Sequence, residues 1–217
     1  MRVPGIATVY ETISKALIKR GVPIFTSGIM DSAERDMLHT GYTLILRPGL
    51  ILGRNTNNGR WFICYGTTLS ADEAAAQTTL SVVKGTGLFP ASDPDAAAFN
   101  IKIVGPGGIP AEQNLGAVVT VGATSIVVTT ALLVDYPSGS FVYRSPATDY
   151  GQDIAQGILW SEASVDAEIG GGDVDAQVVI LTHGIVDSAQ LIGSTDLFLG
   201  QLRDPDVGSI AHRFEFE

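Results

Sequence analysis

The chain has 217 residues, of which 45% are hydrophobic and only 17% charged, with 25 glycines and a formal net charge of −10. This composition is typical of a globular protein rich in turns; it excludes a disordered chain and disfavours nucleic acid as a partner. The single cysteine excludes an intramolecular disulfide and a zinc site built on several cysteines, and no apolar run approaches the ~20 residues of a membrane span.

Residues 1–41 predict an extended arm followed by a short helix. Met1 to Ala7 lacks periodicity and contains Pro4-Gly5, which interrupts the only early apolar run, so we expect an arm and no signal peptide. Thr8 and Glu11 fit a capping box, and Gly21 is placed to end a helix over residues 9–20. Apolar residues recur there at helical spacing: Val9, Ile13, Ala16 and Leu17. A further helical turn is possible over residues 32–38.

Positive charge is concentrated near the N-terminus. Residues 1–63 hold eight Lys or Arg against four Asp or Glu, a balance of +4, and the remainder holds five against nineteen, a balance of −14. The simpler interpretation is ordinary variation on an acidic, soluble surface. The alternative is that the N-terminal segment contacts an acidic partner.

Residues 42–66 predict strands and a hairpin. Tyr42 to Leu46 has strand character, and Pro48-Gly49 turns the chain. Two apolar runs, Leu50 to Arg54 and Arg60 to Tyr65, are separated by Asn57-Asn58-Gly59. Asn-Gly between apolar runs is a strong hairpin signal, because both positions of a tight turn need positive φ.

The composition changes at Gly66, and residues 67–147 predict an inserted β domain. Residues 67–78 indicate a loop or short helix. Gly and Pro clusters then separate five predicted strands, which are Thr79–Val83, Phe99–Val104, Ala117–Val121, Ser125–Thr130 and Ser140–Arg144. Residues 77–83 resemble residues 122–128, either by chance or because a hairpin unit is duplicated.

Residues 148–217 predict two further core strands and a tail. An apolar block ends in Gly157-Ile158-Leu159, and after an acidic, glycine-rich connector Val178 to Leu181 reads as a buried strand. His183-Gly184 allows a tight reversal. Residues 195–202 favour a short helix. Near residue 217 the sequence alternates with a period of two, as in an edge strand. One face would carry Ile210, His212, Phe214 and Phe216.

The residues that carry chemistry in other proteins form no catalytic pattern here. His39, His183 and His212 lack any metal-binding spacing, and Cys64 sits between aromatic residues as a core side chain would. The acids around residues 166–175 do not match a calcium loop, and residues 105–108 lack the lysine of a phosphate loop. We therefore expect no enzyme, no cofactor and no metal.

Two patches resemble the head decoration (capsid cement) proteins of tailed bacteriophages. The first is Pro48 to Arg54 with Arg60-Trp61, similar to the family's first core hairpin. The second patch matches at these residues: Ala155, Gly157, Ile158, Leu159, Val178 to Leu181, His183, Gly184, Val186, Ala189 and Leu191. Relative to this pattern, residues 67–147 are an insertion about which the family says nothing.

The resemblance implies a mainly β protein with a β-clip-like core split between residues 42–66 and 148–192. An inserted β domain (67–147), an N-terminal arm and helix (1–41) and a C-terminal tail with an edge strand (193–217) complete the expected organisation. Such proteins form homotrimers on the outer surface of the virion's capsid and clamp the major capsid protein, after synthesis in the host cytoplasm. Neither nucleic acid nor a membrane is an expected partner.

Two sets of residues follow as expected sites. The core and trimer set is Gly157, Ile158, Leu159, Val179, Leu181, His183 and Gly184. The capsid-binding arm is Arg2, Val3, Pro4, Gly5, Ile6, Lys15, Lys19 and Arg20. The alternative function is a carbohydrate- or receptor-binding module of a phage tail or baseplate, which the inserted β domain would fit equally well.

Overall fold

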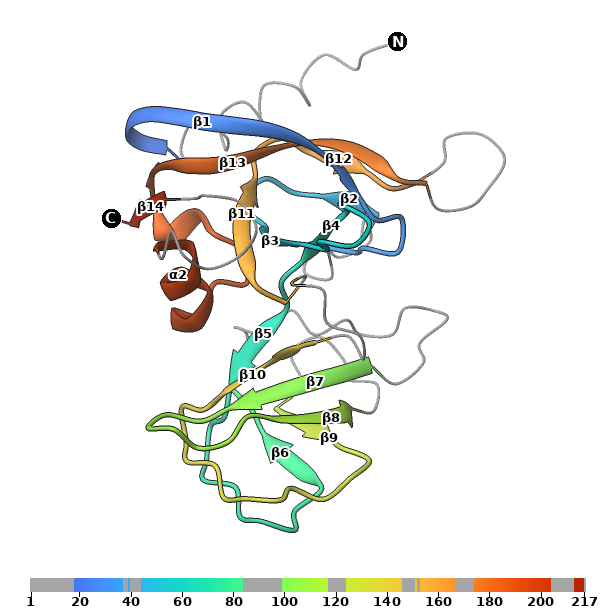
Figure 1. Ribbon diagram of the computed structural model, residues 1–217, viewed down its shortest axis with the longest axis vertical. Helices are drawn as coiled ribbons and strands as arrows, with labels where there is room; N and C mark the ends of the chain where they lie inside the picture. Colours follow the sequence, from blue (N-terminus) through green and yellow to red (C-terminus); the bar gives the residue numbers. More distant parts are fainter. Residues whose placement is uncertain are drawn as a thin grey trace. The chain divides into compact units, whose positions relative to one another are not determined.

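The computed structural model describes residues 18–36, 39, 44–83, 99–116, 124–145, 151, 153–166, 174–203 and 213–216. The chain forms two compact units, residues 1–64 with 150–217, and residues 65–149. The second unit spans nearly the residues expected for the insertion. Both units are mainly β, as the predicted strands indicated (Figure 1).

The strands of the first unit come from both ends of the chain. They are β1 (Ile18–Met30), β2 (Ile45–Leu46), β3 (Ile51–Arg54), β4 (Trp61–Ile63), β11 (Ala155–Leu159), β12 (Ala163–Ser164), β13 (Ala176–Val186) and β14 (Arg213–Phe216). A 3-10 turn, η1 (Ser188–Gln190), and one α-helix, α2 (Asp196–Arg203), follow β13. Within the described residues no helix is long and apolar enough to cross a membrane.

Five of these strands close into a ring. The sheet order is β1-β4-β3-β11-β13-β14, and β1 also pairs with β13 along most of its length. The ring closes where Met30 of β1 pairs with Trp61 of β4. β14 lies outside the ring and pairs in parallel with the last residues of β13. The ring is therefore closed, but at this seam β1 and β4 pair at a single position.

Two glycines make room for a tryptophan inside this ring. Trp61 is 2% exposed. A Cβ on Gly28 of β1 would collide with its indole ring. A Cβ on Gly157 of β11 would lie 2.5 Å from Ile180 Cγ2 and 3.3 Å from Trp61 Cζ3. A narrow ring can hold so large a side chain only where facing positions are small.

The structure corrects the prediction of a helix over residues 9–20. Residues 18–20 begin strand β1, and residues 9–17 lie outside the described residues. The possible turn over 32–38 is not a helix where it is described, at residues 32–36. The reason is a distant partner: from Phe25 to Met30 every residue of β1 pairs in register with β13. Such long-range pairing overrides a local preference for helix.

Two expected turns also differ. β13 runs straight through His183-Gly184 without reversing, because Arg213 and Phe214 of β14 pair with these two residues. The β3–β4 hairpin is present, but its loop is wider than a two-residue turn. The Asn55 N–H donates to Arg60 O at 2.9 Å, Asn55 Oδ1 accepts from the Asn57 N–H, and Gly59 alone takes positive φ there.

The C-terminal tail belongs to the core of the first unit. Phe198 and Leu202 of α2 are buried, and the Gln201 side chain accepts a hydrogen bond of 2.9 Å from the Ala155 N–H. Phe214 of β14 is buried as well. Residues 210–212 of the predicted edge strand lie outside the described residues, and β14 covers the rest of it.

The second unit packs two sheets around its own core. Its strands are β5 (Gly66–Thr68), β6 (Thr79–Ser81), β7 (Phe99–Val104), β8 (Glu112–Gly116), β9 (Ser125–Val127) and β10 (Phe141–Arg144), ordered β5-β10-β7-β8 and β6-β9. Its buried residues include Leu80, Ile103, Ile126 and Val142. Residues 67–78 contain no helix. β8 was not predicted, and the predicted strand 117–121 lies outside the described residues.

Two segments of this unit are related by an approximate two-fold repetition of hydrogen bonds. Glu73 and Tyr136 exchange both backbone hydrogen bonds at 2.8 Å. The Leu69 N–H donates to Ser140 O, and the Leu132 N–H donates to Gln77 O in the same way. Residues 77–83 and 122–128, which resemble each other in sequence, are not part of this repetition. They contain β6 and β9, and these two strands pair with each other.

The repetition places Ala76 where the other segment has Gly139. Ala76 has φ 70° and Gly139 φ 85°, and a Cβ on Gly139 would meet nothing within 4 Å. The left-handed region strains a residue with a Cβ by roughly 1–2 kcal/mol. We expect Ala76→Gly to stabilise this unit by about 1 kcal/mol and Gly139→Ala to destabilise it by a similar amount. Native-state hydrogen exchange of the Leu69 and Leu132 amides measures the stability change of this unit in each variant. If both variants changed the stability by the same amount in the same direction, this explanation would be contradicted.

Candidate functional site

The most unusual surface of the first unit is a stripe of exposed apolar side chains, here called the β1 stripe. It consists of Val22 (87% exposed), Ile24 (52%), Phe25 (40%) and Ile29 (48%) on β1 and Val179 (40%) on β13. β1 and β13 are the two long neighbouring strands in Figure 1. Contiguous apolar patches of this kind mark interaction surfaces in soluble proteins.

The alternation of β1 explains the stripe. Thr26, Gly28 and Met30 pair with residues of β13 whose side chains are buried inside the ring, Ile180, Val178 and Ala176. The intervening residues face outward, and Ser27 pairs with Val179 and Ile29 with Gln177. From Phe25 to Ile29 the outward face thus carries two exposed apolar side chains, whereas Val22 and Ile24 precede the register shift between Ile24 and Phe25.

An aromatic pair anchors one end of the stripe. The rings of Phe25 and Trp160 lie 5.0 Å apart at an angle of 54°, and Trp160 is half-buried. The Trp160 N–H donates to Val179 O at 2.9 Å, so Trp160 is held beside β13. A tilted aromatic pair is a rigid apolar surface with little side-chain entropy left to lose on docking.

The backbone of β1 also offers an edge. One edge pairs with β13 along the strand, and in the described part of the chain the other pairs only at Met30. Residues 21–30 contain no charged residue, and Pro23 is their only residue without an N–H. Native proteins usually protect an exposed edge with charges, proline or bulges. β1 carries one proline and irregular register before Phe25, but from Phe25 to Ile29 it is unprotected.

The expected core and trimer residues divide into two groups. Gly157, Ile158, Leu159 and Leu181 lie inside the protomer, and the last three are fully buried. They pair between β11, β3 and β13, so their role is to build the ring, and their side chains are not available to another subunit. Val179, His183 and Gly184 reach the surface, and of these only Val179 belongs to the stripe.

The expected arm falls mostly outside the described residues. This holds for Arg2, Val3, Pro4, Gly5, Ile6 and Lys15. Lys19 and Arg20 are the second and third residues of β1, and so their backbone leads directly into the stripe. The basic segment and the apolar stripe are thus consecutive in the chain.

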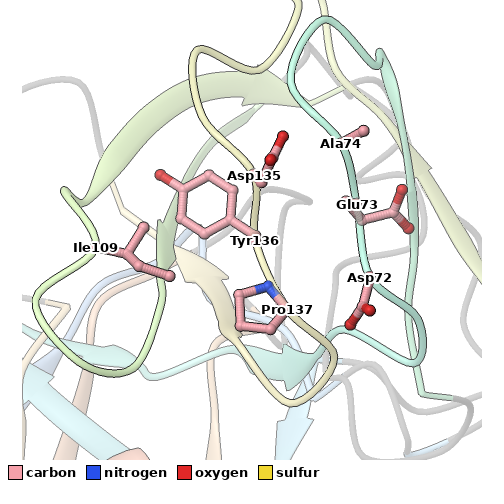
Figure 2. Close-up of a pocket in the computed structure, with 7 residues that line it drawn as sticks. All are labelled: Asp72, Glu73, Ala74, Ile109, Asp135, Tyr136 and Pro137. Carbon is pink, nitrogen blue, oxygen red and sulfur yellow. The ribbon is translucent and has the colours of Figure 1, made fainter.

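The second unit contains a pocket of about 430 Å³ between two facing loops (Figure 2). Its lining is Asp72, Glu73, Ala74, Ile109, Asp135, Tyr136 and Pro137. Asp72 Oδ1 accepts from the Ser138 N–H at 2.8 Å, and Asp135 Oδ1 accepts from the Ala75 N–H at 2.7 Å. Both carboxylates therefore cap the turn opposite.

The tyrosine of this pocket is a structural group. Figure 2 shows its ring directed toward Ile109. Tyr136 is 1% exposed, and its hydroxyl donates to Pro110 O at 2.7 Å. Burial, and secondarily the negative charge of Glu112, raise the pKa of Tyr136. The ring is therefore neither a base nor an open stacking platform.

No catalytic constellation is assembled by the described residues. His39 Nδ1 lies 3.0 Å from Ile45 O, and His183 Nδ1 lies 3.3 Å from the neighbouring Thr182 Oγ1. Cys64 is buried. Within the described ranges, no group of three or more His, Cys, Asp or Glu side chains is arranged to hold a metal ion.

Sequence reasoning missed the β1 stripe because it predicted no strand between residue 20 and Tyr42. The available signal was the apolar run from Val22 to Phe25 followed by Ile29-Met30, a run without charges and rich in β-branched residues. Comparison with known proteins adds no assignment: no family model, no curated protein and no solved structure matches the chain.

Proposed function

We propose that this protein is a structural component of a phage virion that binds the outside of the head as a trimer and stabilises the lattice of the major capsid protein. The mechanism would be energetic and not chemical. A protein that bridges several shell subunits adds contact area, and this area is lost if the shell expands or ruptures.

One observation carries the proposal. The two patches that resemble decoration proteins are far apart in the sequence, yet they supply adjacent strands of one sheet, in the order β4-β3-β11-β13. Ile51 pairs with Ile158, which in turn pairs with Leu181. The residues between the patches form a separate compact unit. A shared core interrupted by an insertion is the arrangement that the resemblance requires.

The surface of the first unit supports an assembly role. A protein that acts alone in solution gains nothing from an apolar stripe that includes a side chain 87% exposed. A lattice protein has neighbours that cover such a surface. The basic N-terminal segment, with Lys15, Lys19 and Arg20, would steer the protein toward an acidic shell and raise its association rate.

The test is sedimentation of the protein with empty heads of the virus that encodes it. We expect saturable binding that a chain lacking residues 1–17 largely loses, because an extended arm binds through main-chain hydrogen bonds. Replacing Lys15 by alanine should weaken binding modestly and reduce its salt dependence; Lys102→Ala in the second unit is the matched control. Full-strength binding by the truncated chain would exclude the arm, and no binding by the full chain would reject the function.

The second candidate is glycan or receptor binding by the 65–149 unit, favoured by its pocket. Asp72 and Asp135 contribute two carboxylates to the lining of this pocket. Against it, two tyrosines of this unit offer no open stacking face, because Tyr136 and Tyr143 are 1% and 6% exposed, whereas Phe141 is half-buried. A glycan array separates the two functions, since Asp135→Ala should abolish a pocket-dependent signal and leave head binding unchanged.

A further inference from the structure

We infer that Asn58, in the loop of the β3–β4 hairpin, is a site of spontaneous covalent modification. The Gly59 nitrogen attacks the Asn58 side chain and ammonia is released, at a rate that the Asn55 side chain limits by holding the loop closed. Water is the only other reactant. The reaction needs neither an enzyme nor a head, so it is independent of the proposed function.

The chemistry is that of an asparagine followed by a glycine. The Gly59 nitrogen forms a bond to Asn58 Cγ, the bond from Cγ to Nδ2 breaks, and the proton of the Gly59 N–H leaves with the side-chain nitrogen as ammonia. Water then opens the cyclic imide at either of its carbonyl groups. One product is aspartate; the other is isoaspartate, in which the main chain runs through Cγ and is longer by a methylene group. Both products carry a negative charge that asparagine lacks.

The sequence favours this reaction at a single asparagine. Glycine has no Cβ, so nothing crowds the attacking nitrogen of Gly59. In the surface loop Asn58 is exposed, so water reaches it and ammonia can leave. The other asparagines are followed by residues that carry a Cβ and therefore serve as internal controls; they are Asn55, Asn57, Asn100 and Asn114.

The loop orients and activates the group under attack. Asn58 Oδ1 accepts from the Arg60 N–H at 3.0 Å, so the side chain folds over the residue that follows it, as in an Asx turn. This hydrogen bond draws electrons away from Cγ. It also stabilises the negative charge that gathers on Oδ1 as the new bond forms.

A second hydrogen bond opposes the reaction, because the attacking nitrogen is itself a donor. The Gly59 N–H donates to Asn55 O at 2.8 Å, and the nitrogen must lose this proton before it can attack. The Asn55 side chain fixes the loop in this state, since its Oδ1 accepts from the Asn57 N–H at 2.9 Å and from the Asn58 N–H at 3.2 Å. Asn55 is only 7% exposed, so these bonds are shielded from water. The loop must therefore open before the reaction proceeds, and Asn55 determines how often it opens.

The experiment is mass spectrometry of peptides from the full-length chain after incubation in mildly alkaline buffer, compared with the same chain unfolded in urea. Both products differ in mass from asparagine, and chromatography separates aspartate from isoaspartate. We expect conversion at Asn58 and not at the other asparagines. It should be slower in the folded chain by about tenfold or more, because opening the loop breaks several hydrogen bonds worth about 1 kcal/mol each.

Two variants at residue 55 test the role of the loop. Asn55→Ala removes the acceptor of two N–H groups, so Asn58 in the folded chain should convert about tenfold faster. Asn55→Asp keeps an oxygen that can accept from both groups, and its rate should stay close to that of the native chain. Tryptophan fluorescence shows whether each variant is folded. If Asn55→Ala does not fold, the comparison of the native chain with and without urea still decides.

The outcomes separate this inference from the proposed function. If Asn58 converts no faster than the other asparagines in urea, it is not a modification site and the inference is overturned. Equal rates in the folded and unfolded chains, or in folded Asn55→Ala and Asn55→Asp, show that the loop does not limit the reaction and also overturn it. A protein that fails to bind heads rejects the proposed function and leaves the modification of Asn58 standing.

Discussion

Replacing Gly157 by alanine is expected to destabilise the first unit by about 3 kcal/mol, near the upper end of overpacking effects. The added methyl group would lie 2.5 Å from Ile180 Cγ2 and 3.3 Å from the backbone oxygen of Leu181. Ile180 is fully buried and branched at Cβ, so it has no free rotamer into which to retreat. Relief must come from the strands, whose pairing closes the ring.

Gly200→Ala is the matched control for this effect. Gly200 lies within α2, and a Cβ there would meet nothing within 4 Å. Alanine in a helix interior is favoured over glycine by about 1 kcal/mol, so this variant should be stabilised. Urea unfolding followed by tryptophan fluorescence is selective, because both tryptophans, Trp61 and Trp160, belong to the first unit. Equal destabilisation by the two variants would contradict close packing as the cause.

Replacing Arg47 by methionine is expected to have the second large effect. It should lower the free energy of unfolding by about 3 kcal/mol. Asp36 is fully buried, and Arg47 binds it at two points, with Nε at 2.5 Å from Oδ2 and a terminal nitrogen at 2.9 Å from Oδ1. Without Arg47 the carboxylate would stay buried, and among the described residues it would keep only a weak backbone donor, the residue 47 N–H at 3.4 Å. The cost is the desolvated charge and not the lost pair.

A double variant distinguishes these two costs. Adding Asp36→Asn to Arg47→Met removes the buried charge and should recover most of the lost stability in chemical denaturation. The control is Arg60→Met at a solvent-exposed network, where the hydrogen bond to Asp31, with the charge of Asp175, raises the pKa of Arg60. Exposed ion pairs contribute little, so this variant should lose much less. If the double variant is no more stable than Arg47→Met, the buried charge is not the cause.

What the sequence could predict was local. The β3–β4 hairpin followed from an Asn-Gly turn between apolar runs, and the short helix predicted over residues 195–202 is present as α2. β1 was missed because a capping box and apolar residues four apart favour a helix into residue 20, while the partner that makes it a strand is distant. Thr182 Oγ1 donates to Ile24 O across 158 residues of sequence. No local pattern contains that contact.

The site was predictable only in part, for a related reason. Gly157, Ile158 and Leu181 were expected from the resemblance to be core or trimer residues, and all three are buried inside the first unit. Which apolar residues remain exposed depends on how the ring closes, since Val178 and Val179 look alike in sequence, yet one is buried and the other is 40% exposed. Successive residues of a strand point to opposite faces of the sheet, and the register of β13 with β1 decides which of the two valines faces the inside of the ring.

The measurement that tests the central claim most directly is the thermal rupture of purified heads with and without the protein. If the protein clamps the shell, the rupture temperature should rise by several degrees, saturate as the binding sites fill, and fall back when the protein is removed by salt. An unchanged rupture temperature at saturating protein, with heads that are otherwise competent to bind, would contradict a stabilising role.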